Sequence, residues 1–330
     1  MPRLQTTFLG CLVVVLGASA IHAETVDLRP KFEKGRETFY RCTMGVDRNM
    51  ETANGQRMNM RIDIEFGMSL KVIDVLVDKN AKLHLTLQYL KIKSDMPPMG
   101  FDTRDEASLA SSPMGNMLTG YVKTPVTLTV SPTGDIETIE GFEKIEAAKG
   151  PAGGLMENIF SEEVAKHLPL FPAAKAGKNP TPTGHKWSEE YDRALPAGMG
   201  TLHTAVDYEL AKLDSATRGA QIPYTYRISL KERDPASSQP ASMVILDNLA
   251  GNATGTMHWD VAAGECREVR GEETAQMDVA MAGNPSMKQK IETRTTSLME
   301  RVDKEAMKLE KTVTQPAPDT TGSTTKPAAQ

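Results

Sequence analysis

Apolar and polar residues alternate strictly along the stretch from Met58 to Val72. Every even position there is apolar, and the intervening odd positions are polar or small. Successive side chains of a β-strand point to opposite faces, so this pattern predicts one long strand with a buried face and a solvated face. The apolar parity changes at Val72-Ile73, where we expect a β-bulge or a bend.

Shorter alternating runs recur in both halves of the chain. They cover residues 83–89, 126–130, 202–210, 224–230 and 257–261. Asp78-Lys79-Asn80, Pro132–Asp135 and Ala263-Gly264-Glu265 have the composition of the turns that separate such strands. Alternation with a single apolar face is typical of antiparallel sheet, because the strands of a parallel sheet are buried on both faces.

Helical patterns are concentrated in the middle of the chain. Residues 105–118, 142–149 and 155–168 are the three segments, and in the last of them apolar residues recur on one helical face. We therefore predict an α+β fold. Its main element is a curved antiparallel β-sheet, open or half-barrel-like, and the helices of residues 105–168 pack on the concave side of that sheet.

The first 23 residues have the features of a secretory signal peptide. Arg3 supplies a positive charge, Phe8–Gly17 is an apolar run, and small residues extend to Ala23. The run is shorter than the ~20 apolar residues that span a bilayer, and no later stretch is apolar enough to be a membrane helix. We expect cleavage near Ala23 and a periplasmic or extracellular mature chain without a transmembrane segment. Cys11 precedes most of the apolar run, which disfavours lipid modification at that cysteine.

The mature chain is expected to form a single β-rich domain over residues 24–312. The similar order of strands and turns suggests two related halves, residues 24–168 and 183–312. The proline-rich stretch 169–182 is predicted to link them. Residues 313–330 consist mainly of small and polar residues that cannot bury enough apolar surface to fold, so we expect a disordered tail.

Four stretches stand out by their order along the chain: Leu28–Gly35 with Phe39-Tyr40, Met58–Met68, Val126–Gly141 and Gly184–Ser188. In this order they resemble a bacterial exported family known as domain of unknown function 6263. The resemblance extends from about residue 28 to residue 300. It implies export and a β-rich fold, and it brings no activity and no catalytic residue to this chain.

Charge and motif content argue against several classes of function. Removal of residues 1–23 takes away Arg3, which leaves 37 basic against 43 acidic side chains, a net charge of −6. This charge, without a long basic block, argues against nucleic acid as a partner. The chain has no Gly-x-Ser-x-Gly elbow, Cys-x-x-Cys pair, His-Glu-x-x-His motif or calcium loop. We therefore expect no enzyme, no catalytic residue, no cofactor and no zinc or calcium site.

Two cysteines remain in the mature chain, Cys42 and Cys266. An oxidising compartment permits a disulfide between distant cysteines. The sequence does not bring their Cα atoms within the distance that a disulfide needs. The bridge therefore stays an alternative, and two buried or unpaired thiols are the favoured interpretation.

Methionine is unusually frequent, with 19 in 330 residues. Thioethers bind copper(I), and pairs such as Met58/Met60, Met96/Met99 and Met277/Met281 have suitable spacing. However, Met58 and Met60 share their parity with the three apolar residues that follow. Methionine fills irregular gaps in apolar cores, so we interpret this face as core or pocket wall. Its residues are Met58, Met60, Ile62, Ile64 and Phe66.

Three hypotheses for function follow from these patterns. Long bent strands can form an open barrel, and a methionine-lined, aromatic-poor interior suits an apolar small molecule or a lipid. The second hypothesis is a structural or interaction module that binds a protein of the cell envelope. The third is copper(I) binding. We expect non-enzymatic binding of an apolar ligand or a protein partner in the cell envelope.

Overall fold

The computed structural model describes residues 24–95, 100–112, 115, 118–146, 160–172, 176–177, 179–195, 199–214, 216, 218–231, 244–281 and 284–308. The predicted signal peptide and the predicted C-terminal tail lie outside these residues. Within the described part of the chain, no helix has the length and apolar character needed to cross a membrane.

One large antiparallel sheet of thirteen strands organises the structure, with its strands in the order β7-β6-β4-β3-β2-β15-β14-β13-β12-β10-β9. The short strands β5 and β11 pair with β4 and β12, and a separate ladder joins β1 (Thr25–Val26) to β8 (Thr181–Pro182). The strands of the large sheet are β2 (Glu37–Thr52), β3 (Arg57–Val75), β4 (Ala81–Ser94), β5 (Phe101–Asp102), β6 (Pro125–Val130), β7 (Ile136–Glu140), β9 (Lys186–Ala194), β10 (Thr201–Glu209), β11 (Lys212–Asp214), β12 (Gly219–Lys231), β13 (Val244–Asp260), β14 (Glu265–Met281) and β15 (Asn284–Val302).

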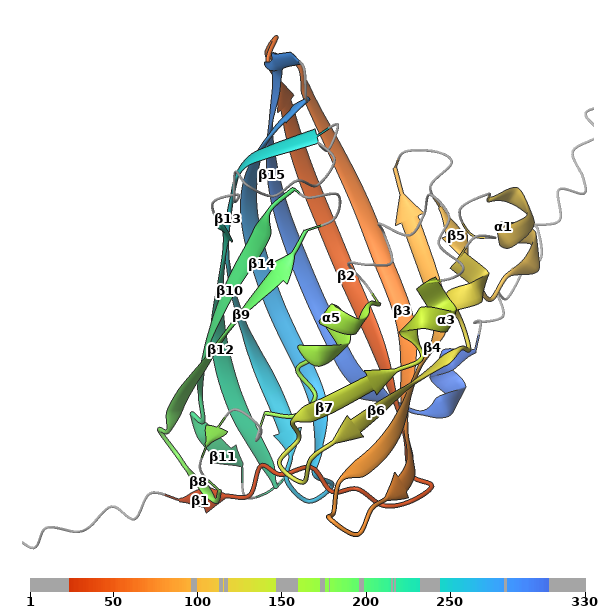
Figure 1. Ribbon diagram of the computed structural model, residues 1–330, viewed down its shortest axis with the longest axis vertical. Coiled ribbons are helices and arrows are strands. Elements are labelled where there is room, and N and C mark those ends of the chain that lie inside the picture. The colour runs from red at the N-terminus through yellow and green to blue at the C-terminus, as the bar shows by residue number, and fades with distance from the viewer. Residues whose placement is uncertain are drawn as a thin grey trace, which may run out of the picture.

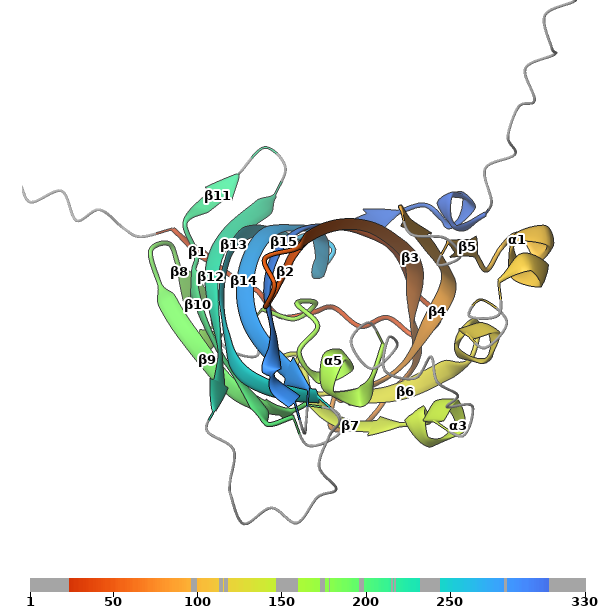
Figure 2. The same cartoon turned by 90° about the horizontal axis from the view of Figure 1, so that it is seen from above.

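The sheet curves into an incomplete ring. Figure 1 shows the long strands β2, β3, β14 and β15 side by side, and Figure 2 shows that the curve brings β7 and β9 towards each other. These two strands are the ends of the sheet, and no ladder joins them among the described residues. The ring therefore has an open seam between β7 and β9.

The long alternating strand predicted from the sequence is β3, Arg57–Val75. Its pairing with β4 shifts register between Val72 and Asp74, which confirms the predicted bulge. The following turn is also confirmed, because the Leu76 N–H donates to the carbonyl of Asn80 across it. Local patterning therefore determines this part of the sheet.

The apolar core lies on the concave face of the sheet. Leu83, Leu85 and Leu87 of β4 are fully buried, and their register partners on β6 include Leu128 and Val126. Strands of the second half contribute to the same core through Met257 and Trp259, each 1% exposed. A single apolar interior thus joins residues from both halves of the chain.

The predicted α+β class is wrong, because the described chain is essentially all-β. Its α-helices are short, among them α1 (Glu106–Ser111), α3 (Phe142–Glu146) and α5 (Glu162–Lys166), with further helical residues at Gly115, Leu118 and Ala176. The helix expected over residues 105–118 begins after the Asp105 cap and is interrupted after Ser111, two residues before a proline that cannot continue a helix. Gly115 and Leu118 beyond it are again helical. Only α5 lies inside the curve of the sheet in Figure 2, whereas α1 and α3 lie at its periphery.

The two halves of the chain meet in one continuous sheet. β2 pairs with β15 from Phe39↔Val302 to Thr52↔Gln289. The described residues of the proline-rich stretch contribute to the interior: Leu170 is 2% exposed, and the Phe171 ring lies 6.0 Å from the ring of Phe32. This stretch therefore helps to fill the space at the seam.

Candidate functional site

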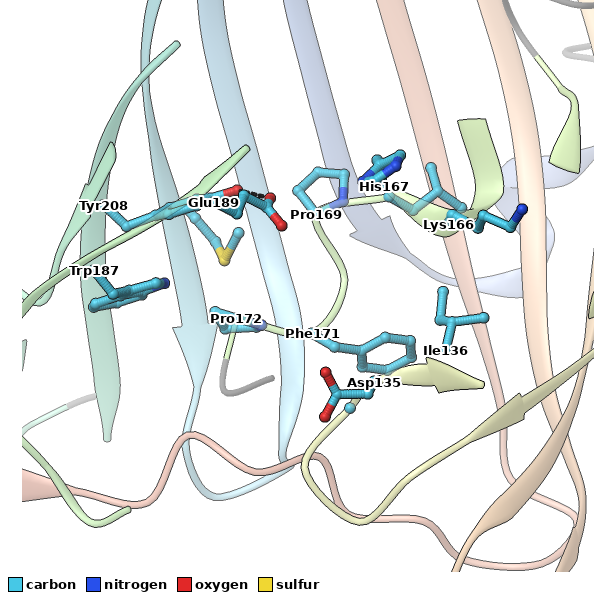
Figure 3. Close-up of a pocket in the computed structure, with 13 residues that line it drawn as sticks. Asp135, Ile136, Lys166, His167, Pro169, Phe171, Pro172, Trp187, Glu189 and Tyr208 are labelled. Atoms are coloured by element: carbon cyan, nitrogen blue, oxygen red, sulfur yellow. Dashed lines mark hydrogen bonds between the residues drawn. The ribbon is translucent and has the colours of Figure 1, made fainter. Parts of the chain in front are cut away.

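A pocket of about 240 Å³ lies inside the ring near the open seam (Figure 3). One wall comes from β9, β10 and β13. The opposite wall comes from the turn between β6 and β7 and from the segment that follows α5. The lining residues are Gly134, Asp135, Ile136, Lys166, His167, Leu168, Pro169, Phe171, Pro172, Trp187, Glu189, Tyr208 and Met257.

Aromatic side chains from adjacent strands form the first wall. Trp187 of β9 is the register partner of Tyr208 of β10, which in turn pairs with Tyr224 of β12. The Trp187 and Tyr208 rings stack with 5.5 Å between centroids and 13° between planes, and the Tyr224 ring lies 6.2 Å from that of Tyr208. Register partners on one face of an antiparallel sheet lie side by side, so the ladder places these three rings in a row.

Two glycines make room for the last ring in this row. Gly255 of β13 pairs with both Tyr224 and Gly271 of β14. A Cβ on Gly255 would lie 2.4 Å from the Tyr224 hydroxyl oxygen, and a Cβ on Gly271 would lie 2.6 Å from it. The Tyr224 hydroxyl instead extends over both glycines and donates to the Arg270 carbonyl at 3.2 Å. The flat glycine surface therefore holds Tyr224 against the sheet.

A tight turn brings the opposite wall into contact with Phe171. Gly134 has a φ of +99°, which favours glycine, and a Cβ there would lie 2.5 Å from the Phe171 Cβ. The turn is closed by the Ser131 N–H, which donates to the Asp135 carbonyl at 2.8 Å. Ile136 follows at the start of β7 and lines the pocket. The turn thus places an aliphatic side chain beside an aromatic one.

Polar groups of the concave face are held by tyrosine hydroxyls. The Tyr208 hydroxyl donates to Glu189 Oε1 at 2.9 Å, and the Tyr226 hydroxyl donates to Glu273 Oε2 at 3.3 Å. Burial, followed by the Glu189 carboxylate, raises the pKa of Tyr208 far above its usual value. Burial also raises the pKa of the Glu273 carboxyl, against the opposing effect of its hydrogen bond from Tyr226. Both hydroxyls are thus bonded to carboxylates of the same sheet face.

A family model described as a family of unknown function, DUF6263, matches residues 78–264 of this chain. The chain belongs to the DUF6263 family. The match begins in the turn before β4 and ends in the turn before β14, and it contains every residue that lines the pocket. Two of the stretches that carried the resemblance, Leu28–Gly35 and Met58–Met68, lie outside it.

None of the curated proteins compared with this DUF6263 chain matches it in sequence. Among solved structures, it is similar to a chain in a study of lipid–protein interactions in lipovitellin, with 11% identity and a TM-score of 0.43. That alignment covers 83% of this chain and 26% of the lipovitellin chain, so this protein spans about a quarter of its length. DynF from the dynemicin biosynthesis pathway of Micromonospora chersina aligns with 7% identity and a TM-score of 0.22, covering 87% of this chain and 89% of DynF. Salmonella typhi OmpF in complex with daunomycin aligns with 8% identity and a TM-score of 0.24, covering 82% of this chain and 99% of OmpF.

The face predicted as a pocket wall on β3 does not line this pocket. Met60 and Ile64 are 9% and 7% exposed and belong to the core, whereas Met58 is 52% exposed near the tip of the β2–β3 hairpin. Ile62 and Phe66 are half-buried and pack against the core. The pocket is lined instead by the turn into β7, by residues between Lys166 and Pro172, and by residues of β9, β10 and β13.

The aromatic content of the pocket differs from the sequence-based expectation. The interior was expected to be poor in aromatic residues, because the whole chain has only 5%. Four of the seven tyrosines lie on the concave face of β9, β10 and β12, together with Trp187, one of the two tryptophans. These tyrosines are Tyr191, Tyr208, Tyr224 and Tyr226. Their shared strand parity was a signal for a common face, and the strand order brings them together.

The disulfide between Cys42 and Cys266 is not formed in the structure, and both residues are buried free thiols. Cys42 lies on β2 and Cys266 on β14, with β15 between these strands. Two strand spacings of about 4.8 Å each separate the two backbones. A disulfide needs a Cα separation of roughly 4.4–6.8 Å, so the strand order keeps the cysteines apart.

The methionine pairs considered for copper(I) lie in different parts of the chain. Met58 is the register partner of Met50 on β2, and β15 lies between Met50 and Met277 of β14. Met96 and Met99 lie outside the described residues. Among the described residues, no group of three histidine, cysteine, aspartate or glutamate side chains has an arrangement that would hold a metal ion.

Proposed function

We propose that this DUF6263 protein binds a small apolar or amphipathic ligand, without enzymatic chemistry, in the pocket at the open seam. The observation that carries the proposal is the convergence of Trp187, Tyr208, Met257 and Phe171 from both walls on one cavity. Ligand sites are concave and mostly apolar, with a few polar groups that fix orientation. The Tyr208–Glu189 pair supplies such groups.

The volume of the pocket limits the size of the ligand. Pockets for drug-sized ligands occupy roughly 300–1,000 Å³, and this one has about 240 Å³. The pocket therefore suits a single ring system or one segment of an aliphatic chain, and a complete diacyl lipid is too large. A ligand that buries about 150 Å² of apolar surface would gain about 4 kcal/mol at 25 cal/mol per Å².

We infer that binding takes place after export, in the cell envelope. The support is the signal-peptide pattern of residues 1–23. In this setting the protein would sequester or carry its ligand, and the open seam would provide the route of entry.

The proposal can be tested by titration with a fluorescent apolar amine of a single fused ring system, 1-aminonaphthalene, on the chain that begins at residue 24. We expect saturable binding with a stoichiometry of one. Ile136→Trp adds a large side chain to the pocket wall, and we expect it to weaken binding at least tenfold. Ile139→Trp is the matched control, because Ile139 is also a partly buried residue of β7 but does not line the pocket. Unsaturable binding, or equal affinity for the two variants, would refute the proposal.

A further inference from the structure

The indole nitrogen of Trp187 is a buried hydrogen-bond donor without a partner. The side chain is 8% exposed, and among the described residues no acceptor lies within hydrogen-bonding distance of its Nε1. Figure 3 shows the nitrogen at the end of the ring that points into the pocket, towards Pro172. Buried donors are nearly always paired, because an unpaired N–H loses its hydration without compensation. The pocket is therefore the place where this donor can find an acceptor.

Neighbouring rings hold Trp187 in this orientation. The His185 ring stacks with the indole with 5.8 Å between centroids and 20° between planes, and the Tyr208 ring stacks with it at 5.5 Å. His185 is itself fixed, since its Nε2 lies 2.8 Å from the Ala176 carbonyl oxygen. Rotation of the indole towards another acceptor would break both stacks. The N–H is thus a preorganised donor directed at the ligand.

The charges around the pocket select against an anionic ligand. Asp135 and Glu189 contribute two carboxylates to the lining. Lys166 contributes an ammonium group, but it forms an ion pair with Glu162 at 2.8 Å. An anionic ligand placed beside these two carboxylates would be repelled, whereas a neutral oxygen would accept the indole hydrogen bond without that penalty.

We propose that the ligand carries an uncharged oxygen acceptor, such as a carbonyl, ether or hydroxyl group, which receives the hydrogen bond from Trp187 Nε1. This inference rests on the proposed function, because it assigns the polar end of the ligand that the pocket binds. The apolar part of the ligand lies against Met257, Phe171 and Ile136. The ligand class is therefore a small neutral ketone, ester, ether or alcohol with an apolar body.

Two probes of nearly identical shape test this assignment. Acetophenone has a carbonyl where α-methylstyrene has a methylene group, and benzoate offers a charged carboxylate of similar size. Calorimetric titration of the chain that begins at residue 24 should show acetophenone binding about five- to tenfold more tightly than α-methylstyrene. Benzoate should bind more weakly than acetophenone.

Trp187→Phe removes the donor and keeps an aromatic ring, so the preference for acetophenone should fall to less than twofold while α-methylstyrene binding persists. Trp259→Phe is the matched control: its nitrogen is also buried without an acceptor among the described residues, but it does not line this pocket. That variant should keep the full preference. Equal binding of both probes by the unmodified protein would overturn the ligand assignment and leave the proposed function standing. If neither probe bound, the proposed function would fail as well.

Discussion

Substitution of Gly255 by alanine probes the surface on which the aromatic wall rests. A Cβ at this position would lie 2.2 Å from the Arg270 carbonyl oxygen and 2.4 Å from Cζ of Tyr224. The carbonyl belongs to a strand of the sheet interior and cannot move without disturbing the ladder, so the neighbouring strands must separate. Such overpacking lowers the free energy of unfolding by about 1–3 kcal/mol. The smaller backbone entropy of alanine offsets about 0.5–1 kcal/mol of this loss relative to glycine within a strand. Because the contact involves backbone, we expect a net loss of about 2 kcal/mol.

Gly45→Ala is the control for the general effect of alanine in a strand. Gly45 lies within β2, and the nearest atom to an added Cβ is the Thr296 Oγ1 at 3.1 Å, the end of a side chain that can shift slightly. We expect this variant to stay within about 0.5 kcal/mol of the unmodified protein. Urea denaturation followed by circular dichroism measures both variants, and Gly255→Ala should also lower the melting temperature by about 4 °C.

A double substitution separates the two contacts at the glycines. An added Cβ on Gly271 meets the Tyr224 hydroxyl at 2.6 Å, and its next neighbour is a serine oxygen at 3.2 Å. Tyr224→Phe removes that hydroxyl, so it should restore much of the stability lost in Gly271→Ala but little of that lost in Gly255→Ala, whose contact includes a carbonyl. The reasoning is refuted if Gly255→Ala is as stable as Gly45→Ala, or if Tyr224→Phe rescues both glycine variants equally.

Three further predictions concern charge and thiol chemistry. Burial raises the pKa of Glu273, so the folded state loses stability as the pH rises from the usual value of 4.5 through the raised pKa. Glu273→Gln should therefore raise the melting temperature at pH 7 and not at pH 4. As the control, Glu272→Gln at an exposed neighbouring position should change the melting temperature little at either pH. Burial raises the pKa of Cys266 to about 12 and that of Cys42 well above its usual value. A disulfide reagent should therefore react slowly with the native chain that begins at residue 24, which lacks Cys11, and should titrate two thiols in denaturant. No thiol in denaturant would indicate a bridge. Arg301→Gln removes the guanidinium that forms ion pairs with Glu265 and Asp260, whose side chains are 14% and 21% exposed. This substitution should lower the free energy of unfolding by about 2–3 kcal/mol in urea denaturation. A loss below about 0.5 kcal/mol would contradict this.

Local patterns predicted those features of the fold that depend on near neighbours in the chain. The strict alternation from Met58 to Val72 identified β3, and the change of parity located the register shift before Asp74. Amphipathic spacing alone does not determine where a helix begins and ends, and the described parts of the predicted helices are interrupted; residues 147–149 and 155–159 of these predictions lie outside the described residues. At α5, a Ser161 cap starts a helix that ends at Lys166. The class of the fold was wrong for this reason.

The pocket was beyond prediction because it depends on the order of the strands in the sheet. The shared parity of Tyr208 and Tyr224 in their runs indicated that each faces inward, but only the pairing of β12 with β10 makes them neighbours. Phe171 and Leu170 lie in a proline-rich stretch whose composition indicated a linker, and its position inside the ring follows from the curvature of the whole sheet. The β3 face showed the clearest apolar pattern, and apart from the exposed Met58 it belongs to the core or packs against it.

The DUF6263 match and the strand order together show what assembles the pocket. Residues 78–264 contain two separate parts of the sheet, β7-β6-β4 with one wall of the pocket and β13-β12-β10-β9 with the other. Four strands lie between these parts in the sheet: β3, β2, β15 and β14. These four strands come from residues 37–75 and 265–302, on either side of the match. The walls are therefore held at their separation by strands from both ends of the described chain. The curvature and width of those four strands, together with the segment inside the ring, therefore set the width of the pocket.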